Sequence, residues 1–202
     1  MSEMTRIALS EAARRLNRGE IGIIPTDTIY GFVASALLPD AVERLYASRG
    51  RNERKPCIVL IADMNDMERF GRVLSLEEKQ LLEKVWPGKV SVILSGFPDR
   101  FSYLHRGTGT LAFRVPDVPA LRDMLRHSGA IIAPSANPEG MKPAETGEES
   151  EAYFGNRADF LVDGGTLSGL PSTIVRLEDG HFGIVRPGSA EDVLRIEHLE
   201  VG

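Results

Sequence analysis

Residues 21–31 read Ile-Gly-Ile-Ile-Pro-Thr-Asp-Thr-Ile-Tyr-Gly, a short apolar run that ends at a proline and passes directly into a polar turn. The apolar part, 21–25, is typical of a buried β-strand. The polar part, 26–31, is followed by a second apolar run at 32–36, which predicts another strand. Because α/β proteins place ligand-binding groups at strand ends, we expect the turn between these strands to belong to a functional site.

Outward from this segment, the chain alternates between apolar runs and amphipathic stretches. Helical spacing between capping and stop signals predicts helices at 10–18, 39–48, 63–70, 75–85, 119–127 and 152–154. Apolar runs predict further strands at 57–62, 90–94, 111–115, 130–134, 160–163, 173–177 and 181–186, the last two as a hairpin. Residues 141–150 are polar and are expected to be mobile, and 190–199 to be helical or mixed. No repeat or linker interrupts the pattern, so we predict one α/β domain over residues 1–202.

The composition narrows the possible classes of protein. Hydrophobic residues make up 42% and charged residues 26% of the 202 residues, which is ordinary for a soluble globular protein. No apolar run approaches the ~20 residues of a membrane span, and the first residues lack the pattern of a secretory signal. The only cysteine, Cys57, begins an apolar run and is interpreted as a buried core residue; four scattered histidines do not indicate a zinc site. We therefore expect a cytoplasmic location.

The charged residues favour a small anionic ligand. The net charge is −5, whereas a protein with a broad nucleic-acid-binding face is usually basic. Four basic residues nevertheless fall within seven positions: Arg49, Arg51, Arg54 and Lys55. Such a local cluster suits a small anionic ligand better than a long polyanion, although a solvated helix end would have the same composition.

Polar residues also follow or interrupt four apolar runs. These are residues 26–28, Arg114, the pair Ser135 and Asn137, and residues 172–173. Each alone could be a turn residue or a surface arginine. Their joint pattern along the chain is more informative than any one of them. Two acids have more than one interpretation: Asp27 could orient the turn of Thr28 or help to place Mg²⁺, and Asp163 could simply form its turn. The structural interpretation is favoured for both.

Seven motifs in order carry a resemblance to a known family. They are Pro-Thr-Asp-Thr-Ile-Tyr-Gly (25–31), Arg-Gly-Arg (49–51), Trp-Pro-Gly (86–88), Ala-Phe-Arg-Val-Pro (112–116), Ala-Pro-Ser-Ala-Asn (133–137), Pro-Ser-Thr-Ile-Val (171–175) and Val-Arg-Pro-Gly (185–188). This set resembles the Sua5/YrdC/TsaC family over about residues 19–188. No P-loop lysine motif or Rossmann fingerprint competes with that interpretation.

The resemblance implies a YrdC-like domain with a twisted mixed sheet, flanking helices and a basic concave face. It implies the synthesis of threonylcarbamoyl-AMP and pyrophosphate from L-threonine, bicarbonate and ATP, for the N6-threonylcarbamoyl modification of A37 in tRNA. It further implies Mg²⁺ bound to ATP without dedicated protein ligands. The implied partners are a TsaD-type transferase complex and tRNA. The chain resembles the short form of the family, which lacks an additional C-terminal domain.

The resemblance also assigns site residues, position by position. The expected catalytic residues are Arg49, Arg51, Ser135 and Asn137. The expected threonine-binding residues are Thr28, Arg114, Ser135 and Ser172. The expected ATP-binding residues are Arg49, Arg51, Lys55, Thr110, Asn137, Thr146 and Arg186.

Two departures from the family pattern keep alternatives open. Arg49 stands where most members have lysine, and an arginine fork does not reproduce a lysine point contact. Leu60 stands where some members have histidine. The alternatives are an RNA-binding protein of this fold without the chemistry, a paralogue that uses another amino acid, and a carbamoyl-adenylate enzyme that uses carbamoyl phosphate.

Overall fold

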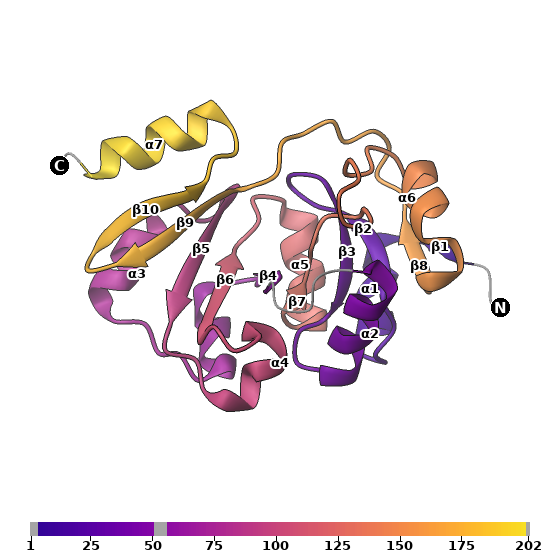
Figure 1. Cartoon of the computed structure of the whole chain (residues 1–202), viewed down its shortest axis with the longest axis horizontal. Helices are drawn as coiled ribbons and strands as arrows, with labels where there is room; N and C mark the ends of the chain where they lie inside the picture. Colours follow the sequence, from indigo (N-terminus) through magenta and orange to yellow (C-terminus); the bar gives the residue numbers. More distant parts are fainter. Residues whose placement is uncertain (1–3, 51–55, 201–202) are drawn as a thin grey trace.

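The computed structural model describes residues 4–50 and 56–200, and within them an α/β arrangement is built on one sheet (Figure 1). The strands are β1 (Thr5–Ile7), β2 (Gly22–Pro25), β3 (Tyr30–Ser35), β4 (Ile58–Leu60), β5 (Val90–Ser95), β6 (Thr110–Arg114), β7 (Ile131–Ile132), β8 (Phe160–Val162), β9 (Thr173–Glu178) and β10 (His181–Arg186). The α-helices are α1 (Leu9–Leu16), α2 (Pro39–Arg49), α3 (Leu76–Glu83), α4 (Ser102–His105), α5 (Pro119–Ser128), α6 (Gly147–Phe154) and α7 (Ala190–Glu200). Short 3₁₀ turns occur at Met64–Phe70, Asp99–Phe101 and Gly155–Arg157.

The sheet is mixed and open, with the strand order β1-β8-β2-β3-β7-β4-β6-β5-β9-β10. Strands β2 and β3 pair antiparallel through the turn quoted above, and β3 continues antiparallel to β7. Strand β4 runs parallel to β6, which pairs antiparallel with β5. Segments that are distant in sequence therefore meet at the centre of the sheet, and their ends surround a common space.

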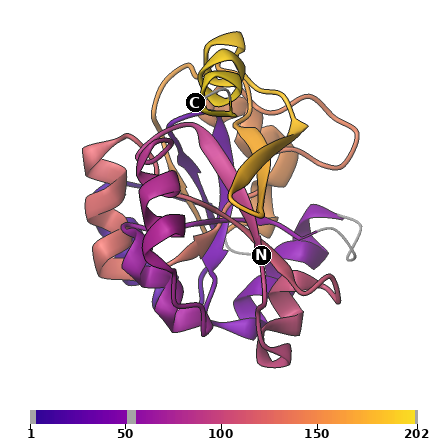
Figure 2. The ribbon, with the colours of Figure 1, turned by 90° about the vertical axis from the view of Figure 1, so that its left-hand side faces the viewer.

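Helices cover both faces of the sheet, and Figure 2 shows α5 and α2 on opposite sides of it. Helices α1 and α5 pack through Leu16, Leu121 and Leu125 on one face, where Ile24 and Val33 belong to the same apolar cluster. A second, larger cluster includes side chains of α2, α3, α6 and α7 together with aromatic residues of the sheet. Burial of these apolar side chains on both faces is the main force that holds the layers together.

The ends of several helices carry clear start and stop signals, although Ser10 and Asp40, the expected N-caps of α1 and α2, lie inside those helices. Helix α2 has Pro39 in its first turn and ends at Arg49, followed by Gly50, whose φ of 62° is left-handed. Helix α3 begins with a capping box, in which Ser75 accepts from the amide of Glu78 and Glu78 accepts from the amide of Ser75. The predicted hairpin of β9 and β10 is confirmed, with its turn at Asp179-Gly180.

Other expectations from the sequence were wrong. Residues 147–150 are helical rather than mobile, because Thr146 caps α6 by accepting a hydrogen bond from the amide of Glu149. Strand β1 was not predicted: it has three residues and forms by pairing in parallel with β8, a tertiary contact without a local signal. The helical turns at 99–105 were also missed.

The segment between β8 and β9 crosses the molecule along the upper side of Figure 1. It approaches the β2–β3 turn so closely that a Cβ at Gly169 would lie 2.4 Å from the carbonyl oxygen of Thr28. Tyr30 fixes the start of the segment, since its hydroxyl donates to the carbonyl of Gly165 and accepts from the amide of Gly164. The central turn is thus held from both sides.

None of the helices formed by the described residues is long and apolar enough to cross a membrane.

Substitution of Gly22 tests how tightly the sheet packs. A Cβ at Gly22 would lie 2.3 Å from the ring of Phe160, which is fully buried. We expect Gly22→Ala to lower the free energy of unfolding by about 1–3 kcal/mol through overpacking. Urea denaturation would measure this. The matched control is Gly183→Ala in β10, where nothing lies within 4 Å of the added Cβ and a change below ~0.5 kcal/mol is expected. Equal effects of the two substitutions would contradict this account.

Candidate functional site

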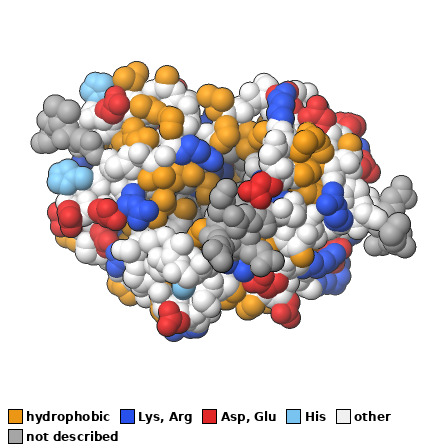
Figure 3. Space-filling model, viewed as in Figure 1, with side chains coloured by type: hydrophobic (Ala, Val, Ile, Leu, Met, Phe, Trp, Pro, Cys, Tyr) orange, Lys and Arg blue, Asp and Glu red, His pale blue; other side chains and the backbone are white. Residues whose placement is uncertain are grey.

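A cavity of about 140 Å³ opens where the central strands end. Its polar lining includes Thr28, Arg114, Ser135, Ser172 and Arg186. Its apolar lining includes Ile29, Ile58, Pro171 and Ile174. Figure 3 shows a face of the molecule that is hollowed near its centre, with Lys or Arg side chains beside the hollow. A small concave site with a few convergent polar groups is typical of ligand binding.

The β2–β3 turn presents Thr28 to this cavity. The Thr26 hydroxyl donates to the carbonyl of Ile29 over 2.6 Å and accepts from the amides of Thr28 and Ile29. The hydroxyls of Thr26 and Thr28 lie 3.1 Å apart. A threonine side chain that bonds to nearby backbone closes a tight turn, and here it fixes the direction of the Thr28 side chain.

Arg114, the last residue of β6, places a positive charge beneath the cavity. Its side chain is only 4% exposed, and that of its partner Asp27 is 2% exposed. The guanidinium donates to Asp27 Oδ1 over 2.9 Å and makes longer contacts with the hydroxyls of Thr28 and Ser91. Burial lowers the pKa of Arg114, and the charge of Asp27 opposes that shift. The guanidinium is therefore a fixed cation, already paired on one side.

Ser172 lies opposite the turn and is held by two contacts. Its hydroxyl lies 2.9 Å from that of Ser91, and its carbonyl accepts a hydrogen bond from Arg186 over 2.8 Å. Ser91 is fully buried in β5, which pairs with β9 through Val90 and Thr173. This pairing places Ser172 at the cavity wall.

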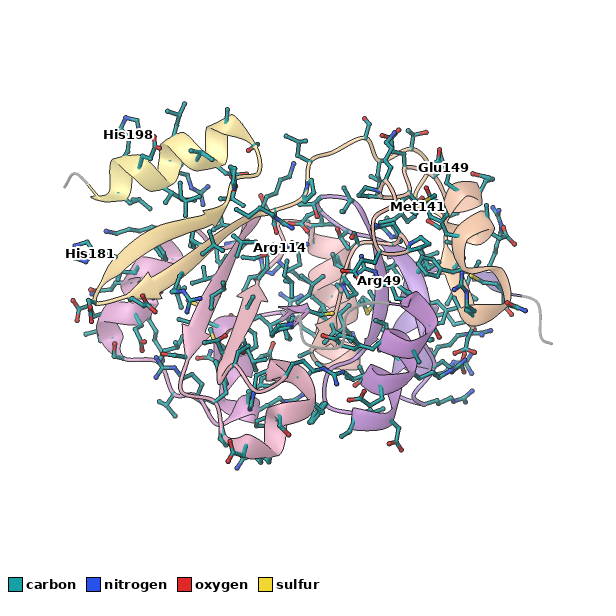
Figure 4. The ribbon with its side chains drawn as sticks, in the orientation of Figure 1. Arg49, Arg114, Met141, Glu149, His181 and His198 are labelled. Atoms are coloured by element: carbon teal, nitrogen blue, oxygen red, sulfur yellow. The ribbon has the colours of Figure 1, made fainter. Side chains whose placement is uncertain are left out.

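Arg49, at the end of α2, holds the segment 135–137. Its guanidinium donates to the carbonyl of Asn137 and the hydroxyl of Ser135, each over 2.9 Å, and to Asn137 Oδ1 over 3.3 Å. The Asn137 side-chain amide donates to the carbonyls of Pro138 and Met141. Figure 4 shows Arg49 and Arg114 toward the middle of the molecule, from α2 and β6 respectively. The Ser135 hydroxyl at the cavity is thus anchored from behind by a buried arginine.

The structure groups most of the predicted site residues. Thr28, Arg114, Ser135, Ser172 and Arg186 line one cavity, and two others, Arg49 and Asn137, brace it. Thr110 begins β6 and lies beside Thr108, and Thr146 caps α6; neither lines this cavity. Arg51 and Lys55 lie outside the described residues.

Two contributors were missed or interpreted differently. Ser91 was not proposed, although a polar residue inside the apolar run 90–94 was a signal of the same kind as Arg114. Asp27 was interpreted as a turn residue, yet it is the ion-pair partner of Arg114. The prediction that Cys57 is a buried core residue is confirmed.

Comparison with known proteins places the chain in a family. A model of the Sua5/YciO/YrdC family, which carries the description "telomere recombination", matches residues 14–188. The chain therefore belongs to this family, and the resemblance inferred from the seven motifs is confirmed.

Individual relatives agree with this assignment. The chain is 38% identical over 184 residues to a Bacillus subtilis (strain 168) protein named threonylcarbamoyl-AMP synthase, covering 89% of this chain and 53% of the relative. It is 32% identical to a protein of the same name from Halorhodospira halophila, covering 85% of this chain and 90% of the relative. The solved structure of P. abyssi Sua5 complexed with L-threonine superposes with a TM-score of 0.82 at 26% identity, covering 95% of this chain and 59% of that one. The chain thus spans about half the length of the Bacillus relative.

Arg49→Lys tests the bracing of residues 135–137. A lysine keeps the charge but cannot reproduce three directed donors, so we expect the free energy of unfolding to fall by about 1–2 kcal/mol. Chemical denaturation would measure the loss. The matched control is Arg44→Lys on the same helix, where an exposed ion pair to Asp159 should contribute less than ~1 kcal/mol. A control that loses as much stability as Arg49→Lys would contradict the bracing role.

Proposed function

We propose that this chain synthesises threonylcarbamoyl-AMP and pyrophosphate from L-threonine, bicarbonate and ATP. The observation that carries the proposal is the convergence of Thr28, Arg114, Ser135 and Ser172 on one small cavity. These are the residues that the family resemblance assigns to threonine. The P. abyssi Sua5 complex with L-threonine, which shares this fold, supports the choice of amino acid.

The cavity has the chemistry that an amino acid needs. A guanidinium matches a carboxylate, and three hydroxyl groups can each donate or accept a hydrogen bond. Ile29, Ile58 and Ile174 add apolar wall for a side-chain methyl group. A cavity of about 140 Å³ suits the amino acid alone, so the nucleotide would occupy the open side.

The proposed reaction has two steps. The threonine amine attacks the carbon of bicarbonate, an N–C bond forms, and water leaves to give a carbamate. A carbamate oxygen then attacks the α-phosphorus of ATP. The new O–P bond replaces the bond from the α-phosphorus to the bridging oxygen, and pyrophosphate leaves with that electron pair. No protein nucleophile is required, because positioning and charge stabilisation dominate such transfers.

Charge is the main demand on the site. A carbamate, a carboxylate and a triphosphate repel one another by several kcal/mol at short range. Among the described residues, Arg114 and Arg186 line the cavity, and Arg49 lies directly behind Ser135. Arg51 and Lys55, outside the described residues, are further proposed contacts to phosphate.

We also propose that Mg²⁺ enters with ATP. The described residues hold no group of three or more His, Cys, Asp or Glu side chains placed to bind a metal ion. Phosphate oxygens and water, the usual ligands of Mg²⁺ on a nucleotide, would supply its coordination. The adenylate would pass to a TsaD-type transferase complex for modification of tRNA at A37.

Pyrophosphate release tests the proposed reaction directly. We expect release from ATP and bicarbonate only when L-threonine is present, with serine poorer by roughly tenfold because it lacks one methyl group. Glycine should support little release. If folded protein binds ATP but releases no pyrophosphate with any amino acid, the synthase proposal is wrong. Salt-sensitive RNA binding in that protein would then favour the RNA-binding alternative.

Metal dependence tests the proposed role of Mg²⁺. We expect excess EDTA to abolish pyrophosphate release and added Mg²⁺ to restore it, because the ion offsets charge on the phosphates. Calorimetric titration of Mg²⁺ into the chain without ATP should show no tight site. Micromolar binding of Mg²⁺ to the chain alone would instead indicate protein ligands for the ion.

A further inference from the structure

Two buried polar residues lie just behind the cavity wall. Asp27 contacts Arg114, and Ser91 contacts both Arg114 and Ser172, but neither is part of the cavity lining. Ser91 is fully buried, and the Asp27 side chain is 2% exposed. Neither side chain contacts solvent appreciably, so the role of each must come from the protein groups that it contacts.

The ion pair of Asp27 and Arg114 is poorly arranged for stability alone. Among the described residues, Asp27 Oδ2 and Arg114 Nε are buried without a hydrogen-bond partner. Buried unsatisfied polar atoms are costly, and a buried ion pair often stabilises no more than an apolar pair of the same volume. The arrangement does have a directional effect: it fixes one side of the guanidinium through Asp27 Oδ1 and Thr28.

Ser91 links the guanidinium to the opposite wall. Arginine can only donate, so the Ser91 oxygen accepts the long contact from Arg114 Nη1. The Ser91 hydroxyl is then free to donate to Ser172 Oγ, 2.9 Å away. In that direction of donation, the Ser172 proton remains available to a ligand in the cavity. Arg114 and Ser172 would together present donors to a single anionic group.

We propose that Asp27 and Ser91 are positioning residues that orient Arg114 and Ser172 to bind the carboxylate of the amino-acid substrate. The inference rests on the proposed function for the identity of that substrate, but it concerns binding and not turnover. It assigns to the Asp27 carboxylate an orienting role in addition to balancing charge. When the charge of Asp27 is removed, these two roles predict opposite changes in the preference for a ligand that carries a carboxylate.

The test compares L-threonine with L-threoninamide, which has no carboxylate. Calorimetry would give the ratio of their dissociation constants for the wild-type chain and for Asp27→Asn. If Asp27 only balances charge, its removal makes Arg114 more attractive to an anion and the preference for the acid rises. If Asp27 orients Arg114, we expect the preference to fall about tenfold, as for loss of one charge-assisted hydrogen bond.

Controls make the result independent of folding and of the reaction. The ratio does not depend on the folded fraction, and Asp159→Asn removes an equivalent partner of an arginine, Arg44, away from the cavity and should leave the ratio unchanged. If Asp27→Asn fails to fold, Ser91→Ala provides the test. A fall of about threefold or more in the preference for L-threonine over L-threoninamide supports the proposal, because that is the effect of losing one neutral hydrogen bond. An unchanged preference overturns it. An unchanged or increased ratio in Asp27→Asn also overturns it. A wild-type chain that prefers the acid yet releases no pyrophosphate would refute the proposed synthase activity and leave this inference standing.

Discussion

A buried positive charge at the end of β6 is the constraint on which the rest of the site depends. The Arg114 side chain is buried, so the fold must supply the counter-charge and the hydrogen-bond acceptors of its guanidinium. Asp27 supplies the charge from the β2–β3 turn, and Ser91 an acceptor from β5. Because these elements are separated in sequence, the order of the strands in the sheet is what brings the charge and its partners together.

The same principle appears on the other side of the cavity with a different arginine. Arg49 is buried at the end of α2 and directs its donors at the 135–137 segment, which places Ser135. Arg49, where the family resemblance led us to expect lysine, therefore has an internal role visible in the structure. A planar group with several donors suits that role better than an ammonium would.

Much of the fold followed from local sequence signals. The strand–turn–strand unit at 21–36, the capped helices and the β9–β10 hairpin each have patterns of apolar spacing or turn residues that work over short distances. Strand β1 and the start of α6 do not: the first depends on pairing with β8, and the second on a Thr146 cap within a polar stretch. Likewise, motif order identified Thr28 and Ser172, whereas the roles of Asp27 and Ser91 depend on contacts between strands that no local pattern specifies.

The way the cavity is assembled also bears on when it can exist. Its parts come from the second strand, the middle of the chain and the segment at 171–186, and β9 must pair with β5 before Ser172 reaches its place. Contacts of such long sequence separation form late in folding. A nascent chain would therefore lack the complete cavity until the segment at 171–186 has left the ribosome and β9 can pair with β5.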